Sequence, residues 1–312
     1  MGPEPLPDDP RLPGLVAFRE HGVDAVLARH GVRTPASTVR VLGHNVGQRC
    51  TLLVGGDGER LVVKAYADDP APLLSILDAL AAAGLADGRA PSVPPLIACD
   101  RRLAFTVTPL FSGPSMHQLM RAGAGLRAGT LAAAWLRASA RVELAIGVPY
   151  SPDALLAEAP AWIVTLEAAD SALAAEATEH LAVLAADRPR VGRRTLLHGS
   201  YSHDHVLELP DGPGVIDLDN VGYGPVELDA GMMLASLSRL RGSSARAAGA
   251  TERAAQAFRA GLAGLVEETA LDWYRAALLV KLAKRLADKR PGRWQERAGA
   301  LLQEAGQALA AR

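Results

Sequence analysis

The residue types that could do chemistry gather in one stretch of the chain. They are, in order, His198, Ser200, Asp204, His205, Asp217 and Asp219. Carboxylate oxygens are the ligands that a hard cation such as Mg²⁺ prefers. A serine hydroxyl can donate or accept a hydrogen bond, and an imidazole can move a proton. The stretch can therefore hold a metal ion and a reacting hydroxyl side by side.

Short apolar runs flank these residues and must position them. Residues 195–197 form a strand-like run before His198, and a second run covers residues 206–209. Residues 210–213, Pro-Asp-Gly-Pro, have the composition of a tight turn, because proline presets φ and glycine permits positive φ. A third run, residues 214–216, ends at Asp217. The pattern predicts a hairpin with polar loops at its end.

The stretch resembles the catalytic core of the aminoglycoside phosphotransferase and choline kinase group, relatives of the protein kinases. That group has the pattern H-G-D-x-x-x-x-N, a hairpin, then I-D, and then G-D-P-x-x-D-L. The pairs His198-Gly199 and Ile216-Asp217 match it, and Asp229 matches the closing aspartate. The resemblance extends from Val39 through most of the chain.

Three positions depart from the family pattern. Ser200 stands in place of the catalytic aspartate, His205 in place of the metal-binding asparagine, and Gly224-Pro225-Val226 in place of G-D-P. A serine hydroxyl cannot act as a carboxylate base near neutral pH. Asp204, one residue before His205, is a candidate for the missing carboxylate.

The resemblance implies an α+β, two-lobed protein-kinase-like fold, with a small β-rich N-lobe, a larger α-helical C-lobe and ATP between them. It divides the chain into an N-terminal arm with helices (residues 1–38), the N-lobe (39–110) and the helical C-lobe (111–312). The length also suits about two domains.

The N-lobe part changes from helical to strand periodicity. Strand-like runs cover residues 39–42, 50–54 and 61–66, and further strands are expected at 94–98 and 103–107. The link at residues 55–58, Gly-Gly-Asp-Gly, is typical of a hairpin. The link at residues 43–48 contains Gly43 and Gly47, and such a loop can bring backbone N–H groups close to a phosphate.

Lys64 follows three apolar residues in the third of these runs. It resembles the kinase V-A-I-K lysine, which reaches the phosphates of ATP; the alternative is an edge lysine on a solvated face. The helix predicted over residues 70–83 lacks the glutamate that pairs this lysine in active kinases, and its only acid is Asp78. Thr108 and Leu110 fall where the family's hinge meets adenine.

The resemblance assigns roles to the remaining candidates. Asp217 would hold Mg²⁺, with Asp219 and His205 as further metal ligands. His198 would bond the backbone near the metal loop, in a catalytic group with Ser200 and Asp204. Together with ATP, these residues indicate transfer of the γ-phosphate to a hydroxyl of a small molecule or of a peptide Ser/Thr.

Other interpretations stay open. The absent catalytic aspartate and helix glutamate favour a pseudokinase, a scaffold that binds nucleotide or a partner protein. The run His203-Asp204-His205 could instead bind a transition metal, since imidazole suits such ions. A nucleophilic Ser200 activated by a histidine lacks the G-x-S-x-G turn that would support it.

Composition narrows the possible partners. The net charge of −1 gives no electrostatic reason for nucleic-acid binding. Two cysteines, Cys50 and Cys99, are too few for a disulfide framework and are expected as buried free thiols. No apolar run reaches membrane-spanning length and the N-terminus does not resemble a signal peptide, so a cytoplasmic protein without membrane contact is expected.

The C-lobe part is predicted to be almost wholly helical. Helices are expected from Ser115, a candidate N-cap, to residue 120, and then over residues 131–146, 153–158, 161–186, 226–240, 246–264, 266–289 and 293–311. Lysines and arginines give residues 281–293 a basic side. This side is either a solvated face or a docking surface for an acidic ligand.

Overall fold

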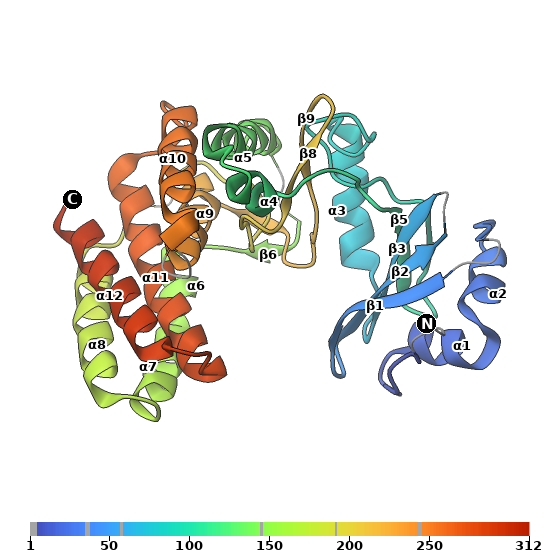
Figure 1. The fold of residues 1–312 in the computed structure, drawn as a ribbon, viewed down its shortest axis with the longest axis horizontal. Coiled ribbons are helices and arrows are strands. Elements are labelled where there is room, and N and C mark those ends of the chain that lie inside the picture. The colour runs from blue at the N-terminus through green and yellow to red at the C-terminus, as the bar shows by residue number, and fades with distance from the viewer. Residues whose placement is uncertain are drawn as a thin grey trace. The chain divides into compact units, whose positions relative to one another are not determined.

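The computed structural model describes residues 5–34, 38–56, 59–143, 146–190, 192–241 and 245–311. The chain is divided into two compact units, Met1–Ser112 and Gly113–Arg312. Strands dominate the first unit and helices the second (Figure 1).

A five-stranded antiparallel sheet forms the first unit, with strand order β1-β2-β3-β5-β4. Its elements are α1 (Pro13–His21), α2 (Val23–Ala28), β1 (Thr38–Asn45), β2 (Arg49–Gly55), β3 (Arg60–Tyr66), α3 (Ala71–Ala82), β4 (Ala98–Asp100) and β5 (Phe105–Pro109). The strand predicted at residues 94–98 is wrong in its bounds, because β4 begins at Ala98 and only the Ile97 N–H, which donates to the Val107 carbonyl at 2.8 Å, joins β5 before it. Pro94 and Pro95 have no N–H to donate to a ladder. In the predicted hairpin at 55–58, Gly55 pairs with Arg60, and residues 57–58 lie outside the described part.

The core of the first unit lies between the sheet and the N-terminal helices. Leu61, Val63 and Ala65 of β3 are buried, whereas the residues between them are half-buried, so alternate side chains point to opposite faces. The buried face packs with Leu15 and Phe18 of α1 in one apolar cluster. Cys50, fully buried, belongs to this cluster, while Cys99 is only half-buried; both thiols are free.

Helices α4 to α12 form most of the second unit. Their bounds are α4 (Met116–Arg121), α5 (Gly125–Ser139), α6 (Pro152–Ala157), α7 (Ala159–Glu167), α8 (Ser171–Ala186), α9 (Val226–Arg241), α10 (Ala245–Gly261), α11 (Glu268–Lys289) and α12 (Trp294–Ala310). Ser115 caps α4 as predicted, in a reciprocal capping box with Gln118. In the described part of the chain, no helix is both long and apolar enough to cross a membrane.

The single helix predicted over residues 161–186 is wrong, because the structure has α7 and α8 there. Asp170 separates them: its side chain accepts hydrogen bonds from the N–H groups of Ala172 and Leu173 at 3.1 and 3.2 Å. An aspartate N-cap satisfies donors that a helix leaves unpaired at its start. The helix predicted over 131–146 lies earlier, at Gly125–Ser139.

Short strands of the second unit lie around the polar stretch. Strands β6 (Val148–Pro149), β10 (Gly222–Gly224) and β7 (Thr195–Leu197) form a three-stranded sheet, in that order. Strands β8 (Val206–Leu209) and β9 (Gly212–Val215) form the predicted hairpin, one to two residues earlier on its second strand than expected. Since Leu209 pairs with Gly212, only two residues make the turn.

The alanine-rich composition allows helices of the second unit to approach closely. Helix α11 packs against α7, α9 and α12, and its Trp273 Nε1–H donates to the Leu184 carbonyl at 3.0 Å. Helices α5 and α10 meet at two glycines. A Cβ at Gly125 would stand 2.0 Å from the Ala250 carbonyl oxygen, and one at Gly129 would stand 2.1 Å from that of Ala254. Larger residues would force these two helices apart.

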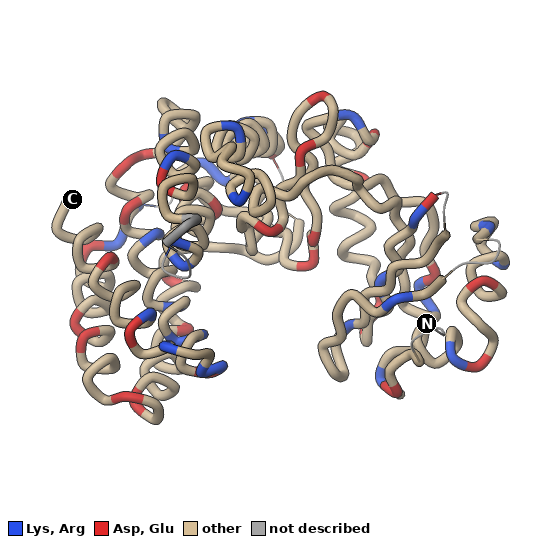
Figure 2. Tube along the Cα trace, in the orientation of Figure 1, with Lys and Arg blue, Asp and Glu red and all other residues tan. Residues whose placement is uncertain are grey.

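Acidic partners accompany the basic side predicted over residues 281–293. Lys281 Nζ lies 2.6 Å from Glu158, Lys284 pairs with Asp288, and Arg293 pairs with Glu296. In Figure 2, basic residues (blue) and acidic residues (red) both occur along α11 and α12. Three of the six basic residues on this side are thus ion-paired at the surface, which favours the solvated-face interpretation over an acidic ligand.

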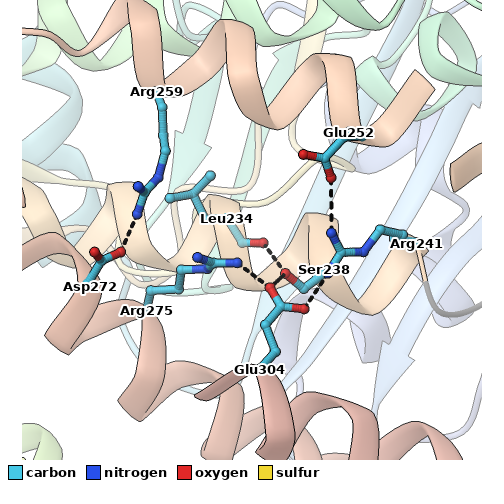
Figure 3. A network of polar contacts seen from close by, with 8 residues as sticks. All are labelled: Leu234, Ser238, Arg241, Glu252, Arg259, Asp272, Arg275 and Glu304. Atoms are coloured by element: carbon cyan, nitrogen blue, oxygen red, sulfur yellow. Dashed lines mark hydrogen bonds and ion pairs between the residues drawn. The ribbon is translucent and has the colours of Figure 1, made fainter. Parts of the chain in front are cut away.

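A less exposed ion-pair network joins four helices of the second unit (Figure 3). Glu304 of α12 is 12% exposed and accepts hydrogen bonds from Arg275 of α11, Arg241 of α9 and the Ser238 hydroxyl. Arg241 also donates to Glu252 of α10 at 3.0 Å. Removing the glutamate would leave two guanidinium groups without their shared anion, which is costly in a partly dehydrated site.

We predict that Glu304→Ala lowers the free energy of unfolding by on the order of 3 kcal/mol. The matched control is Glu296→Ala on the same helix, whose pair with Arg293 is 65–78% exposed and should contribute less than about 1 kcal/mol. Urea titration followed by circular dichroism measures both. Equal costs would show that the network adds nothing beyond a surface ion pair.

Candidate functional site

A buried carboxylate holds the loop that begins the polar stretch. Asp229, in the first turn of α9, is 1% exposed. Its Oδ2 accepts the His198 N–H at 2.6 Å and its Oδ1 accepts the Gly199 N–H at 3.0 Å. The two N–H groups follow directly on β7, so Asp229 fixes how the chain leaves that strand. From the sequence, Asp229 could either cap the N-terminus of its helix or brace the preceding loop, and these hydrogen bonds correspond to the second role.

The same loop requires glycine at position 199. Gly199 has φ +71°, in the left-handed region that side chains rarely adopt. A Cβ there would stand 2.1 Å from the Asn220 carbonyl oxygen and 2.3 Å from the Tyr150 hydroxyl. The Tyr150 hydroxyl donates to the same Asn220 carbonyl at 2.8 Å. The loop is thus packed directly against the segment that follows Asp217.

Burial shifts the protonation of the bracing carboxylate. Desolvation raises the pKa of Asp229 from 3.8 to about 7, although the two backbone N–H donors act to lower it. Burial penalises the charged form, whereas hydrogen bonds to the carboxylate favour it. Desolvation is the larger effect here, so the pKa of Asp229 lies near neutral pH.

His198 connects the loop to the end of the hairpin. Its Nε2–H donates to the Ile216 carbonyl at 2.9 Å, which leaves Nδ1 as an acceptor in the neutral ring. The Ser200 hydroxyl lies 3.1 Å from Nδ1, and the Ser200 N–H lies 3.3 Å from it. The Ser200 hydroxyl is therefore oriented as a donor to His198, while its oxygen keeps acceptor capacity.

His205 and Asp217 meet at the same place. His205 Nδ1–H donates to the Ser200 carbonyl at 2.9 Å, and its Nε2 lies 3.5 Å from Asp217 Oδ2. Asp217 has φ +69°, an uncommon conformation for a non-glycine residue. Such a backbone is retained where the surroundings fix it. Asp219, two residues further on, is half-buried.

Asp204 does not join this group. Its carboxylate oxygens lie 3.5 Å from His203 Nε2 and 3.5 Å from His117 Nδ1 of α4. His203 is 2% exposed, and burial lowers its pKa to about 4. Of the predicted catalytic residues, the structure brings His198 and Ser200 together with His205 and Asp217, and places Asp204 in a separate cluster.

The predicted nucleotide-binding residues lie in the first unit. Lys64 belongs to β3, the central strand of the sheet, where it pairs with Thr51 and Thr106. An edge lysine is thus excluded. Lys64 is half-buried, on the opposite face from Val63 and Ala65 and hence from α1. In α3, Asp78 is exposed and the helix contains no glutamate.

The loop between β1 and β2 already binds a carboxylate. The N–H of Gly47 donates to Asp9 Oδ2 at 2.6 Å, and His44 Nε2 lies 2.8 Å from the same oxygen. The hydrogen bond from Gly47 is the main cause of a lowered pKa at Asp9, followed by that from His44. Gly43 lies in the ladder opposite Thr51. Phosphate binding at this loop stays a prediction, and it requires other N–H groups or the departure of Asp9.

The predicted adenine contacts stay predictions as well. Thr108 lies in β5 opposite Val62 and is half-buried. The Leu110 N–H donates to the Arg60 carbonyl at 2.8 Å. Since that N–H is engaged in the sheet, the carbonyl of Leu110 is the group that could face a base.

Two residues that contact the predicted site residues were not identified from the sequence. Asp9 lies in the N-terminal arm, to which no site residue was assigned, and His117 lies in the short helix predicted from Ser115 to residue 120. Neither has a local motif. Both act through residues far away in the chain, His44 and Asp204, so only the fold brings the partners together.

Comparison with known proteins gives the family. Residues 13–265 match APH, the phosphotransferase enzyme family. This match covers most of the chain, so the chain belongs to that family. Among curated proteins, no sequence matches.

Solved structures with the same fold agree. A thermostable mutant of aminoglycoside phosphotransferase APH(4)-Ia, in a ternary complex with ADP and hygromycin B, has TM-score 0.65 and 16% identity over 93% of this chain and 98% of its own. Choline kinase LicA from Streptococcus pneumoniae has TM-score 0.60 and 13% identity over 88% and 94%. Spectinomycin phosphotransferase APH(9)-Ia, in complex with ADP and spectinomycin, has TM-score 0.58 and 14% identity over 92% and 97%. The predicted protein-kinase-like α+β fold is confirmed.

The pKa of Asp229 predicts how its contribution to stability varies with pH. A carboxyl whose pKa is raised in the folded chain stabilises fully below its unfolded value and loses this effect as pH rises through the folded value. The free energy of unfolding of the wild type, minus that of Asp229→Asn, should therefore fall by up to about 4 kcal/mol between roughly pH 4 and pH 7. Urea titrations at each pH measure it. A difference that does not vary with pH would contradict this prediction.

Proposed function

We propose that this protein is an ATP- and Mg²⁺-dependent phosphotransferase that transfers the γ-phosphate to a hydroxyl of a small molecule. Family membership supports the reaction class. One observation in the site carries the proposal: the loop from His198 and the hairpin end converge so that His205 Nε2 and Asp217 Oδ2 stand 3.5 Å apart. A cation held there by these two residues would stabilise negative charge on a phosphate, and phosphoryl transfer depends mainly on positioning and charge stabilisation.

The donor set suits Mg²⁺ in part. Asp217 and Asp219 offer carboxylate oxygens, which Mg²⁺ prefers, and Mg²⁺ commonly keeps several waters beside one or two carboxylates. His205 offers an imidazole nitrogen, a poorer Mg²⁺ ligand. Its Nδ1–H is engaged by the Ser200 carbonyl, so in the neutral ring Nε2 is an acceptor. It could accept a hydrogen bond from a metal-bound water. When bound, the ion would neutralise charge on the phosphates.

Ser200 would orient the acceptor rather than deprotonate it. Its hydroxyl proton is directed to His198, and the oxygen can accept a hydrogen bond from an acceptor hydroxyl. It cannot take the proton as a carboxylate would. Because the transition state of phosphoryl transfer is loose, loss of the base slows the reaction without removing the contribution of positioning.

Two similar structures suggest the class of acceptor. One is a complex with hygromycin B and another a complex with spectinomycin. Both are low-identity neighbours, so they support a small hydroxylated acceptor in general terms. A hydroxyl of a peptide Ser/Thr is the other acceptor class, for which no comparison gives support.

A second function is a pseudokinase that binds nucleotide or a partner protein without turnover. The specific observation that favours it is Ser200 in the loop position next to His198, with Asp204 directed to His117 and His203 instead. No carboxylate of this loop therefore replaces the missing base in the structure. The alternative differs from the first proposal in turnover, not in nucleotide binding.

We predict that ATP binds in a Mg²⁺-dependent manner and that Asp217→Asn weakens this binding at least about tenfold, because a metal ligand is lost. Calorimetric titration of ATP with and without Mg²⁺ measures it. The control is Asp211→Asn, an exposed acid in the turn between β8 and β9, which should bind like the wild type. Undiminished Mg-ATP binding by Asp217→Asn would overturn the proposal that Asp217 is a Mg²⁺ ligand. A wild-type protein that does not bind ATP would overturn the proposed phosphotransferase function.

We also predict that Ser200→Asp raises ATP turnover, measured as ADP release, by on the order of 100-fold, because it restores a carboxylate base. Ser200→Ala should lower the wild-type rate by less than about tenfold, since the serine orients the acceptor hydroxyl but supplies no base. Loss of a robust rate in Ser200→Ala would instead show that the serine itself carries the chemistry. A zero rate in the wild type together with a gain in Ser200→Asp would select the pseudokinase.

A further inference from the structure

A second group of metal-ligating side chains lies in the same unit. His117, His203 and Asp204 each offer a ligand atom, and these atoms all lie within 4.8 Å of one another. His203 Nε2 and His117 Nδ1 each stand 3.5 Å from an oxygen of Asp204. In the described part of the chain, this is the one group of three such side chains that meets this spacing.

Backbone pairing brings the three residues together. Ser115 forms a β-bridge with Leu207, and the Glu208 N–H donates to the Pro114 carbonyl at 3.0 Å. His117 lies two residues beyond Ser115, at the start of α4. Residues 203–204 lie just before β8 in the other segment. The cluster is therefore built on a paired scaffold, which is what a binding site requires.

The buried histidine is oriented by a residue of α9. The Ser236 hydroxyl donates to the Met233 carbonyl at 2.8 Å, so its oxygen accepts from His203 Nδ1–H, which lies 3.1 Å away. In the neutral ring, Nε2 is then an acceptor, and it faces an oxygen of Asp204, also an acceptor. Metal-bound histidines commonly have their other ring nitrogen fixed in this way. Two acceptors face each other across the space that a cation would fill.

We propose that His117, His203 and Asp204 bind one divalent transition-metal ion, represented by Zn²⁺. Tetrahedral zinc with bonds of about 2.0–2.2 Å has ligand atoms about 3.4 Å apart. Here His203 Nε2 stands 3.5 Å from Asp204 Oδ2 and His117 Nδ1 stands 3.5 Å from Asp204 Oδ1, so each histidine faces one oxygen of the carboxylate at close to that spacing. Two imidazoles and one carboxylate suit zinc better than Mg²⁺ or Ca²⁺, which prefer oxygen. Three protein ligands leave a fourth position open to water.

This site is distinct from the proposed magnesium site and does not depend on the proposed function. The structure assigns the two histidines of the His203-Asp204-His205 run to different places: His203 faces Asp204, whereas His205 faces Asp217. The transition-metal site considered for that run thus gains His117, which is distant in sequence, and loses His205. Zinc here would join α4 to the loop that contains Ser200.

Calorimetric titration of the full chain with ZnCl₂ alone, without ATP or Mg²⁺, tests the proposal. We expect one zinc ion per chain and a loss of at least about tenfold in affinity for His117→Ala. His117 is 38% exposed, so this variant should keep its fold, which circular dichroism checks. Cobalt(II) provides a second measurement, since its visible absorption reports tetrahedral ligation and should be lost in the same variant.

Two control variants make the result decisive. His21→Ala removes an exposed histidine of α1, and Asp217→Ala removes the central ligand of the proposed magnesium site. Both should bind zinc like the wild type. No zinc binding by the wild type, unchanged binding by His117→Ala, or loss of binding in Asp217→Ala would each overturn the proposal. Loss of Mg-ATP binding in Asp217→Ala with zinc binding intact would separate the two sites.

Discussion

The hydrogen bonds from the His198 and Gly199 N–H groups to the buried Asp229 carboxylate are the constraint on which the site depends. They hold the chain as it leaves β7, and so they set the direction of the His198 ring. That ring donates to the Ile216 carbonyl, one residue before Asp217. The same loop carries the Ser200 carbonyl that orients His205. One carboxylate near the positive end of α9 therefore indirectly positions the residues proposed to hold the metal.

The sequence correctly predicted the turns and caps that depend on residues close together in the chain. The turn between β8 and β9 consists of Pro210 and Asp211, within the four residues whose composition predicted a turn. Ser115 was recognised as a cap because capping acts within three residues. The strand expected at residues 94–98 failed because its apolar run contains two prolines, whose missing N–H groups outweigh its hydrophobicity. Asp9 and His117 could not be found this way. Their partners lie far away in the chain, so their proximity is a property of the fold and not of any window of residues.

Ser200, where the family pattern has an aspartate, gives the loop a hydroxyl in place of a carboxylate. His198 Nδ1 accepts from both the N–H and the hydroxyl of Ser200, so the serine is a fitting neighbour for this ring. The brace by Asp229 and the contact of His198 with Ile216 involve other atoms and do not depend on residue 200. The loop can therefore keep its shape with or without the base. This independence makes a well-formed loop compatible with the absence of a carboxylate at position 200.

Helix α9 holds the loop at both ends. At the beginning of the loop, Asp229 accepts a hydrogen bond from the His198 N–H, and near the end of the loop Ser236 contacts His203. These two residues are seven positions apart, which is close to two helical turns, so they lie on the same side of the helix. His205 is oriented from within the loop and His203 from α9, and the two rings therefore serve different carboxylates. A shift of α9 along its axis would move both anchors together, and the Ser200 segment between them would have to follow.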